Sequence, residues 1–83
     1  MKIAFKLFAS LSDYLPAGSR DNRIELDVEE GVTVGELIRR YQVPERSAHL
    51  VLVNGIFIPP AQRLRHRLKP GDEVAVWPPI AGG

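Results

Sequence analysis

The chain has 83 residues, a formal net charge of +1 and no cysteine. This length allows one domain near the lower limit for a self-sufficient core, and the small net charge argues against nucleic acid as the main partner. The missing cysteines exclude disulfides, zinc–thiolate sites and a cysteine nucleophile, and two histidines alone make neither a metal site nor a catalytic set. No apolar run is long enough to span a membrane and no signal peptide is visible, so we expect a cytoplasmic protein without membrane contact.

The first part of the chain predicts two strands with a loop between them. Residues 2–8 and 23–29 both alternate between apolar and polar positions, which is typical of strands with one buried face. The core-facing positions would be Ile3, Phe5 and Leu7 in the first strand and Ile24, Leu26 and Val28 in the second. Phe8 is then left on the opposite face. The residues between the strands predict a loop, with a short helical turn that Pro16 ends.

A change of period predicts the main helix. Its apolar stripe, spaced at i, i+3, i+4 and i+7, consists of Val34, Leu37, Ile38 and Tyr41. Thr33, followed three residues later by Glu36, is the signature of a capping box, and Pro44 marks the exit. We therefore expect a helix over about residues 34–42 that packs on one face of a sheet.

The segment LVLVNGIFI predicts a hairpin. Asn54-Gly55 can adopt the positive φ angles of a two-residue turn between apolar strands. The turn pairs Val53 with Ile56 and Leu52 with Phe57. One face carries the β-branched set Val51, Val53, Ile56 and Ile58. If that face lies in the core, Leu52 and Phe57 point outward, and the sequence also allows the opposite choice.

A basic connector follows the hairpin. We expect Leu64 and Leu68 to anchor it to the core. Its cations are Arg63, Arg65, Arg67 and Lys69. They fit either an acidic surface of an activating enzyme or a solvated loop. Pro70-Gly71 then fits the two central positions of a type II turn.

The order of strand, strand, helix, strand, strand and final strand indicates an α+β roll, with one helix covering one mixed sheet. We expect this domain to occupy residues 1–77. In the last strand Val74 and Val76 face the core, which directs Trp77 outward with Phe8. An exposed apolar patch on so small a protein indicates an interface. The alternative is that loop residues cover the two rings.

Residues 78–83, PPIAGG, form the predicted flexible tail. Pro78 and Pro79 cannot donate to a sheet and favour an extended backbone, so they direct the chain off the domain. Gly82 and Gly83 have no side chain, which lets them enter a narrow channel and approach another backbone closely. The C-terminal carboxylate would then be the uncommon functional group of the protein, although a frayed chain end is the alternative reading.

Three segments carry a resemblance to a known family. FKLFASL near the start, VNG in the middle and GDEVAVWPPIAGG at the end resemble the MoaD/ThiS family of ubiquitin-like sulfur carriers, in particular the small subunits of molybdopterin synthase. The resemblance covers nearly the whole chain in order. It implies a β-grasp fold in which the first and last strands are parallel neighbours. It also implies a carrier that is not itself an enzyme and that binds no cofactor or metal.

The same resemblance implies a set of partners. An E1-like adenylating enzyme of the MoeB/ThiF type would activate the carboxylate of Gly83 with ATP. A sulfur donor, either a cysteine desulfurase or a rhodanese, would then supply the sulfur of a thiocarboxylate. The large subunit of molybdopterin synthase would receive the tail residues Ile80, Ala81 and Gly82 in its active site. The partner interface would consist of Phe8, Phe57, Trp77, Pro78 and Pro79.

Other functions begin with the same activated glycine. The resemblance also admits a carrier for thiamine thiazole synthesis, for tungsten-cofactor synthesis or for another thiocarboxylate pathway. A ubiquitin-like modifier would instead join Gly83 to lysines of other proteins through isopeptide bonds. A plain interaction module would need the apolar face and not the tail.

Overall fold

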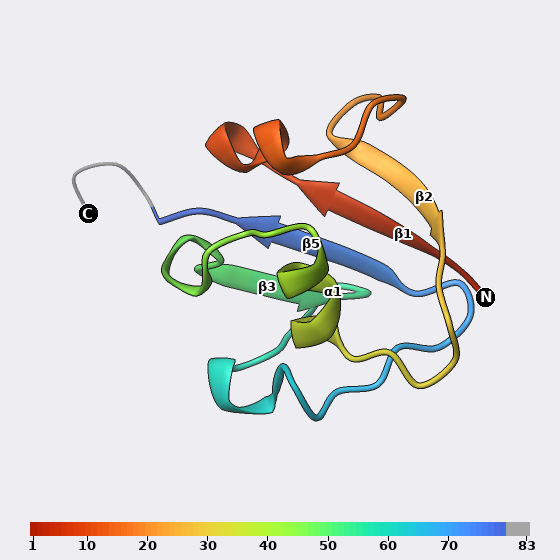
Figure 1. Ribbon diagram of the computed structural model, residues 1–83. Coiled ribbons are helices and arrows are strands. Elements are labelled where there is room, and N and C mark those ends of the chain that lie inside the picture. Colours follow the sequence, from red (N-terminus) through yellow and green to blue (C-terminus); the bar gives the residue numbers. More distant parts are fainter. Residues whose placement is uncertain (80–83) are drawn as a thin grey trace.

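The structure, a computed structural model, describes residues 1–79. It is a five-stranded mixed sheet with an α-helix lying across one face (Figure 1). The strands are β1 (Lys2–Leu7), β2 (Arg23–Asp27), β3 (Leu50–Val53), β4 (Ile56–Phe57) and β5 (Glu73–Trp77), and the helix is α1 (Val34–Arg40). The 3-10 turns are η1 (Ala9–Tyr14), η2 (Glu45–Ser47) and η3 (Pro60–Gln62). The predicted α+β roll is confirmed.

The last strand of the chain lies at the centre of the sheet. The strand order is β2-β1-β5-β3-β4, so β5 has a neighbour on each side. It runs parallel to β1, with Phe5 opposite Val74, and antiparallel to β3, with Val51 opposite Val76. The parallel pairing of the first and last strands, which the family resemblance implied, is therefore present.

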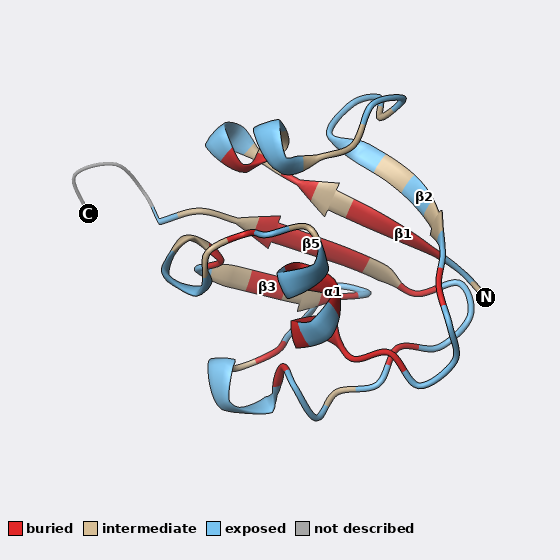
Figure 2. Cartoon of the chain, in the orientation of Figure 1, coloured by how far each residue is buried: buried red, intermediate tan, exposed pale blue. Residues whose placement is uncertain are grey.

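The core lies between the sheet and α1. Buried residues concentrate in the central strands and in the helix (Figure 2). Phe5, Leu37 and Val76 are fully buried there, and the ring of Tyr41 packs against that of Phe5 at a centroid distance of 5.3 Å. The core residues predicted for β1, α1 and β5 are thus confirmed. In β2 the inward residues Ile24 and Leu26 are only half-buried, because this strand forms an edge of the sheet.

The helix begins as predicted and ends two residues earlier. The Thr33 side chain accepts from the Glu36 amide and the Glu36 carboxylate accepts from the Thr33 amide, which completes the capping box. At the other end Gln42 takes a left-handed φ of 63°. Its amide donates to the carbonyl of Arg39, and the next amide, that of Val43, donates to Ile38. These two bonds form a Schellman motif, which stops the helix before Gln42.

The Asn54-Gly55 hairpin is confirmed, with φ angles of 52° and 82° at the two turn residues. The predicted pairs are present, and Val51, Val53 and Ile58 are buried while Phe57 points outward. The inclusion of Ile56 in the core was wrong, since this side chain is 67% exposed. It sits beside the turn on the edge strand, where it borders a depression whose lining includes Arg67 and Lys69.

Leu68 anchors the connector as expected, but Leu64 does not. Leu68 is buried, whereas Leu64 is 46% exposed and lies over the first turn of α1. A Cβ atom on Gly35 would come within 2.6 Å of Leu64 Cδ2, so only a glycine allows this close approach. The amide of Gly35 donates to the carbonyl of Arg63 at 2.8 Å. The connector therefore holds the start of the helix mainly through its backbone.

The Pro70-Gly71 turn closes before β5 in the predicted way. Gly71 has a φ of 83°, and the amide of Asp72 donates to the carbonyl of Lys69 at 3.1 Å. Both features fit a type II turn.

Within residues 1–79 no helix combines the length and the apolar composition that crossing a membrane requires.

Candidate docking surface and tail attachment

Two aromatic rings stack on the face of the sheet that α1 does not cover. The rings of Phe8 and Trp77 lie 4.4 Å apart between centroids and within 6° of parallel. Phe8 follows β1 and donates its amide to the carbonyl of Val76 at 3.1 Å, which fixes its position beside β5. Both side chains are half-buried. The rings therefore pack on each other and keep an exposed side, as the strand pattern predicted.

The register of β3 extends this patch across the sheet. Leu50 lies opposite Trp77, and Leu52 lies opposite Ala75 and, on its other side, opposite Phe57. Partners in register point to the same face of a sheet. The outer apolar surface is thus made of Phe8, Leu50, Leu52, Phe57, Ala75 and Trp77. Phe57 is 50% exposed, and an ion pair between Lys6 and Glu73 at 3.2 Å borders the surface.

Leu50 is the member of this surface that sequence reasoning missed. Its place depends on which residue of β3 faces Trp77, and pairing between distant strands leaves no local signature in the sequence. The alternation of LVLV together with the face of Trp77 could have indicated it, because Leu50 and Leu52 share one face of that strand. The predicted interface residues Phe8, Phe57 and Trp77 do lie on one face of the sheet.

The predicted tail begins where the sheet ends. The amide of His49 donates to the carbonyl of Trp77 at 3.0 Å, and the two residues after Trp77 are prolines, which have no amide to donate. Pro78 is half-buried and Pro79 is exposed. The predicted site residues Ile80, Ala81, Gly82 and Gly83 lie outside the described residues.

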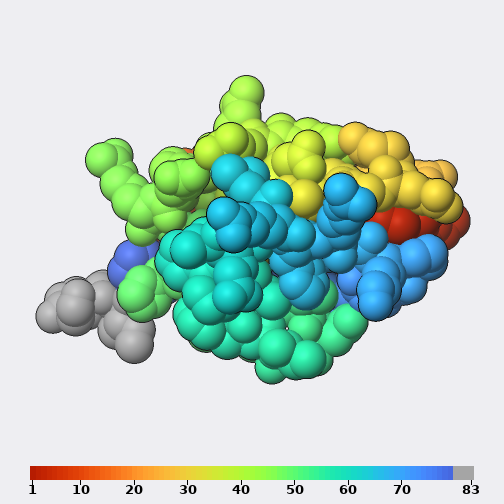
Figure 3. All heavy atoms as spheres, turned by 90° about the horizontal axis from the view of Figure 1, so that it is seen from below, coloured from red at the N-terminus to blue at the C-terminus, as the bar shows by residue number. Residues whose placement is uncertain are grey.

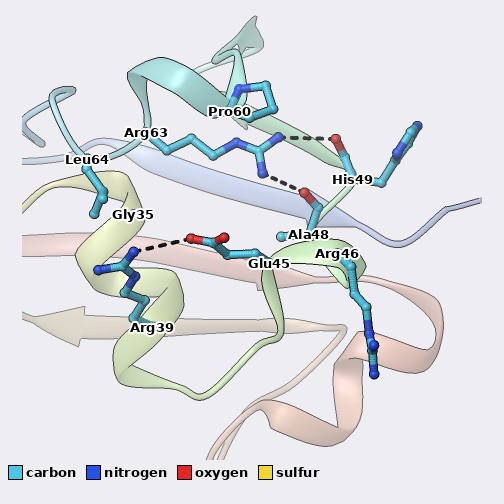
Figure 4. Close-up of a pocket in the computed structure, with 9 residues that line it drawn as sticks. All are labelled: Gly35, Arg39, Glu45, Arg46, Ala48, His49, Pro60, Arg63 and Leu64. Atoms are coloured by element: carbon cyan, nitrogen blue, oxygen red, sulfur yellow. Dashed lines mark hydrogen bonds and ion pairs between the residues drawn. The ribbon is translucent and has the colours of Figure 1, made fainter.

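A separate groove lies on the helix side of the molecule. It is formed by α1, η2, the start of β3 and the η3 connector, and has a volume of about 410 Å³ (Figure 4). Figure 3 views the molecule from the side on which β4, η3 and the connector, in green to blue, make up much of the surface. Three arginines and one glutamate line the groove, together with apolar side chains.

Arg63 lines this groove as a buried residue, which corrects its assignment to a free basic stretch. The residue is only 8% exposed. Its guanidinium donates to three backbone carbonyls, those of Ala48 at 2.6 Å, His49 at 3.2 Å and Ile58 at 3.3 Å. Burial lowers the pKa of the Arg63 guanidinium, and the carboxylate of Glu45 acts in the opposite direction. Arg63 therefore fastens η2 and β3 to the connector, while Arg65, Arg67 and Lys69 are exposed.

The described part of the chain holds no candidate metal site. Among residues 1–79 no three His, Asp or Glu side chains come together in a way that could hold a metal ion.

Comparison with models of protein families identifies the family of this chain. The model of the ThiS family matches residues 5–83. The chain belongs to this family. The match begins within β1, runs through β5 and continues through Gly82-Gly83, and the family is that of the MoaD/ThiS ubiquitin-like sulfur carriers. A comparison with curated protein sequences gives no significant match.

Solved structures share the fold. SAMP1 from Haloferax volcanii is 29% identical over 100% of both chains, with a TM-score of 0.68. A Pyrococcus furiosus protein described as molybdopterin converting factor, subunit 1, is 26% identical over 95% of this chain and 98% of its own, with a TM-score of 0.68. A chain from the complex of subunits 1 and 2 of the molybdopterin-converting factor of Helicobacter pylori is 19% identical over 100% of both chains, with a TM-score of 0.61. The ThiS-family chain thus has the β-grasp fold of ubiquitin-like proteins.

Proposed function

We propose that this ThiS-family protein carries sulfur as a thiocarboxylate on Gly83 and delivers it for molybdopterin synthesis. The observation that carries the proposal is the family match through Gly82-Gly83, in a short segment that follows a central strand and begins with two prolines. The likeness to the Pyrococcus furiosus converting-factor subunit supports the molybdopterin pathway over the thiamine pathway. The protein acts here as a non-catalytic carrier, and the large subunit of the synthase supplies the active site.

The chemistry explains why a glycine terminus would suit the task. A carboxylate is inert toward nucleophiles, so an E1-like enzyme first joins a carboxylate oxygen of Gly83 to the α-phosphorus of ATP, and pyrophosphate leaves. The carbonyl of this acyl adenylate is then attacked by the sulfur of a persulfide on the donor, and AMP leaves. Reductive cleavage of the sulfur–sulfur bond by a thiol frees the thiocarboxylate. Gly82 and Gly83 present no side chain to the two active sites that receive them in turn.

The fold supports separate roles for the outer apolar surface, which would bind the partner, and for the tail, which would carry the sulfur. The outer apolar surface and the end of β5 lie on the same part of the sheet, since Trp77 belongs to both. A partner that covers the stacked rings of Phe8 and Trp77 is therefore positioned to receive the chain that follows Pro78 and Pro79. The protein needs no bound cofactor for this role, because ATP is the co-substrate of the activating enzyme.

Intact mass measurement tests the proposal. The full chain is incubated with ATP, an adenylating enzyme of the MoeB/ThiF type and a persulfide donor. We expect the mass to rise by the difference between one sulfur and one oxygen atom, and fragmentation should place the change at Gly83. The proposal is wrong if the mass stays constant under conditions that convert an established carrier.

The proposed binding of the outer apolar surface to the large synthase subunit gives a second prediction. Replacing Trp77 by Asp should weaken binding to the large synthase subunit by about 2 kcal/mol, or roughly thirtyfold, because an aromatic anchor is lost and a carboxylate is placed on an apolar surface. Calorimetric titration measures the affinity, and thermal unfolding checks that the fold survives. Ile56→Asp is the matched control, since Ile56 is exposed and apolar but lies outside the outer apolar surface. An equal loss in both variants would remove Trp77 from the interface.

Protein modification is a second candidate function, favoured by the 29% identity to SAMP1, a small archaeal modifier protein. In that case the activated Gly83 would be attacked by a lysine amine and form an isopeptide bond, with AMP as the leaving group. Epitope-tagged protein expressed in its native cell distinguishes the two functions. Covalent adducts that depend on Gly83 and resist reducing agents would support modification, and thiocarboxylate without adducts would support sulfur delivery.

A further inference from the structure

The groove beside Arg63 is a second candidate binding site, on the opposite side of the sheet from the outer apolar surface. Its walls come from the first turn of α1, from η2 and from η3, as Figure 4 shows. A volume of about 410 Å³ lies within the range of sites that bind small ligands or peptide side chains. The groove shares no residue with the outer apolar surface, so both could be occupied at once.

Part of the groove lining is apolar. Ala48, Pro60 and the partly exposed Leu64 contribute to its lining. Gly35 adds a stretch of wall without a side chain, which keeps the groove open next to Leu64. An apolar side chain of a ligand would bury surface here.

The lining of the groove carries an excess of positive charge. It includes three arginines and a single acidic residue, Glu45. Glu45 points toward Arg39, whereas the side chain of Arg46 points away from Arg39 and Arg63 (Figure 4). Within residues 1–79 Arg63 makes no ion pair, because all three of its bonds go to backbone carbonyls. A cation held at low exposure is poorly screened, so its field reaches into the groove.

The one ion pair at the rim is weak enough to be replaced. Arg39 and Glu45 approach to 3.3 Å, but their side chains are 60% and 78% exposed. Exposed pairs of this kind contribute about 0–1 kcal/mol. A carboxylate from a ligand could therefore take the place of Glu45 at little cost.

We propose that this groove binds an acidic segment of a protein partner, with an apolar side chain of the segment against Pro60 and Leu64 and its carboxylates near Arg39 and Arg63. The combination of apolar and cationic lining favours such a segment over a small anion, which would gain the charge interaction without the apolar burial. The inference rests on the groove and is independent of sulfur transfer. A partner could bind this protein on the helix side while the outer apolar surface of the protein engages another enzyme.

Nuclear magnetic resonance on the isotope-labelled full chain tests this proposal. The probe is a short peptide that repeats Asp-Glu-Leu, capped at both ends. We expect saturable shifts of the amides of Gly35, Ala48 and Leu64, with those of Phe8 and Trp77 unchanged. Replacing the acidic residues of the peptide by Lys should abolish the shifts, and replacing its Leu by Ser should weaken binding. Binding should also weaken as salt screens the charges.

Charge reversal supplies the matched comparison. Arg39→Glu should weaken peptide binding about fivefold or more, because attraction in the groove becomes repulsion. Arg20→Glu makes the same change of net charge beside β2, at the far edge of the sheet, and should leave binding nearly unchanged. Thermal unfolding confirms that each variant is folded.

Three results would overturn the proposal. One is the absence of saturable shifts in the groove, and another is an equal loss of binding in Arg20→Glu. The third is that inorganic phosphate alone shifts the same amides to the same extent, which would make the groove a small-anion site. None of these outcomes bears on Gly83, so the test stands apart from the proposed sulfur transfer.

Discussion

Deletion of Gly83 is expected to abolish thiocarboxylate formation and sulfur transfer while leaving the melting temperature unchanged. The reacting carboxylate is then carried by Gly82, one residue short of the position that the adenylating enzyme reaches. Every core residue described here precedes Pro78, so the deletion removes no packing between the sheet and α1. Single-turnover assays with the activating enzyme and with the synthase large subunit measure the loss, and calorimetry measures the stability.

A substitution at Gly82 tests the effect of the width of the tail separately from the effect of its length. Gly82→Val keeps the terminal carboxylate in place and adds a β-branched side chain, so it should impair transfer through steric conflict in a narrow channel. Its affinity for the large subunit through the outer apolar surface should change much less. Full sulfur transfer by the Gly83 deletion would contradict the proposed function and would favour a protein that acts through its surface alone.

The second large effect is expected at Arg63. Replacing it by Met retains the length of the side chain but leaves the carbonyls of Ala48, His49 and Ile58 without their donor. Each bond to a charged donor contributes about 1.5–3 kcal/mol, and removal of the buried cation returns part of this through relief of desolvation. We expect a net loss of about 3 kcal/mol in the free energy of unfolding, or roughly a hundredfold in the unfolding equilibrium. Urea denaturation measures this difference.

Two further substitutions identify the cause of that loss. Arg63→Lys keeps the charge but cannot reach three divergent carbonyls with one ammonium group, so it should recover only part of the stability. Arg65→Met removes a cation of the same connector at an exposed position and should change the free energy of unfolding by less than about 0.5 kcal/mol. If Arg63→Met is as stable as Arg65→Met, the three hydrogen bonds contribute little.

Local sequence signals predicted the elements that depend on neighbouring residues. The capping box of α1, the Asn54-Gly55 turn and the Pro70-Gly71 turn all involve residues within four positions of one another, and all three are present. Alternation also identified the faces of β1 and β5, because the period of a strand is short and unambiguous. These signals were enough to indicate the fold and the outward direction of Phe8 and Trp77.

Features that depend on distant parts of the chain were not predicted correctly. Ile56 has the composition of a core residue, but its position at the edge of the sheet is set by the order of all five strands. Leu64 and Arg63 appear in a basic, loop-like run, where a leucine predicts burial and an arginine predicts exposure. The structure reverses both. The acceptors of Arg63 are backbone carbonyls, which no side-chain pattern reveals. Leu64 lies over the first turn of α1 and stays partly exposed there.

The central position of β5 has a mechanical consequence. A partner that draws in the chain beyond Pro79 pulls along the axis of β5, whose hydrogen bonds to β1 and β3 lie across the direction of that force. Bonds arranged in this way resist together in shear, whereas a strand pulled away sideways would open one bond at a time. An enzyme can therefore pull on the tail of this protein without detaching β5, the strand to which the tail is joined, from the sheet.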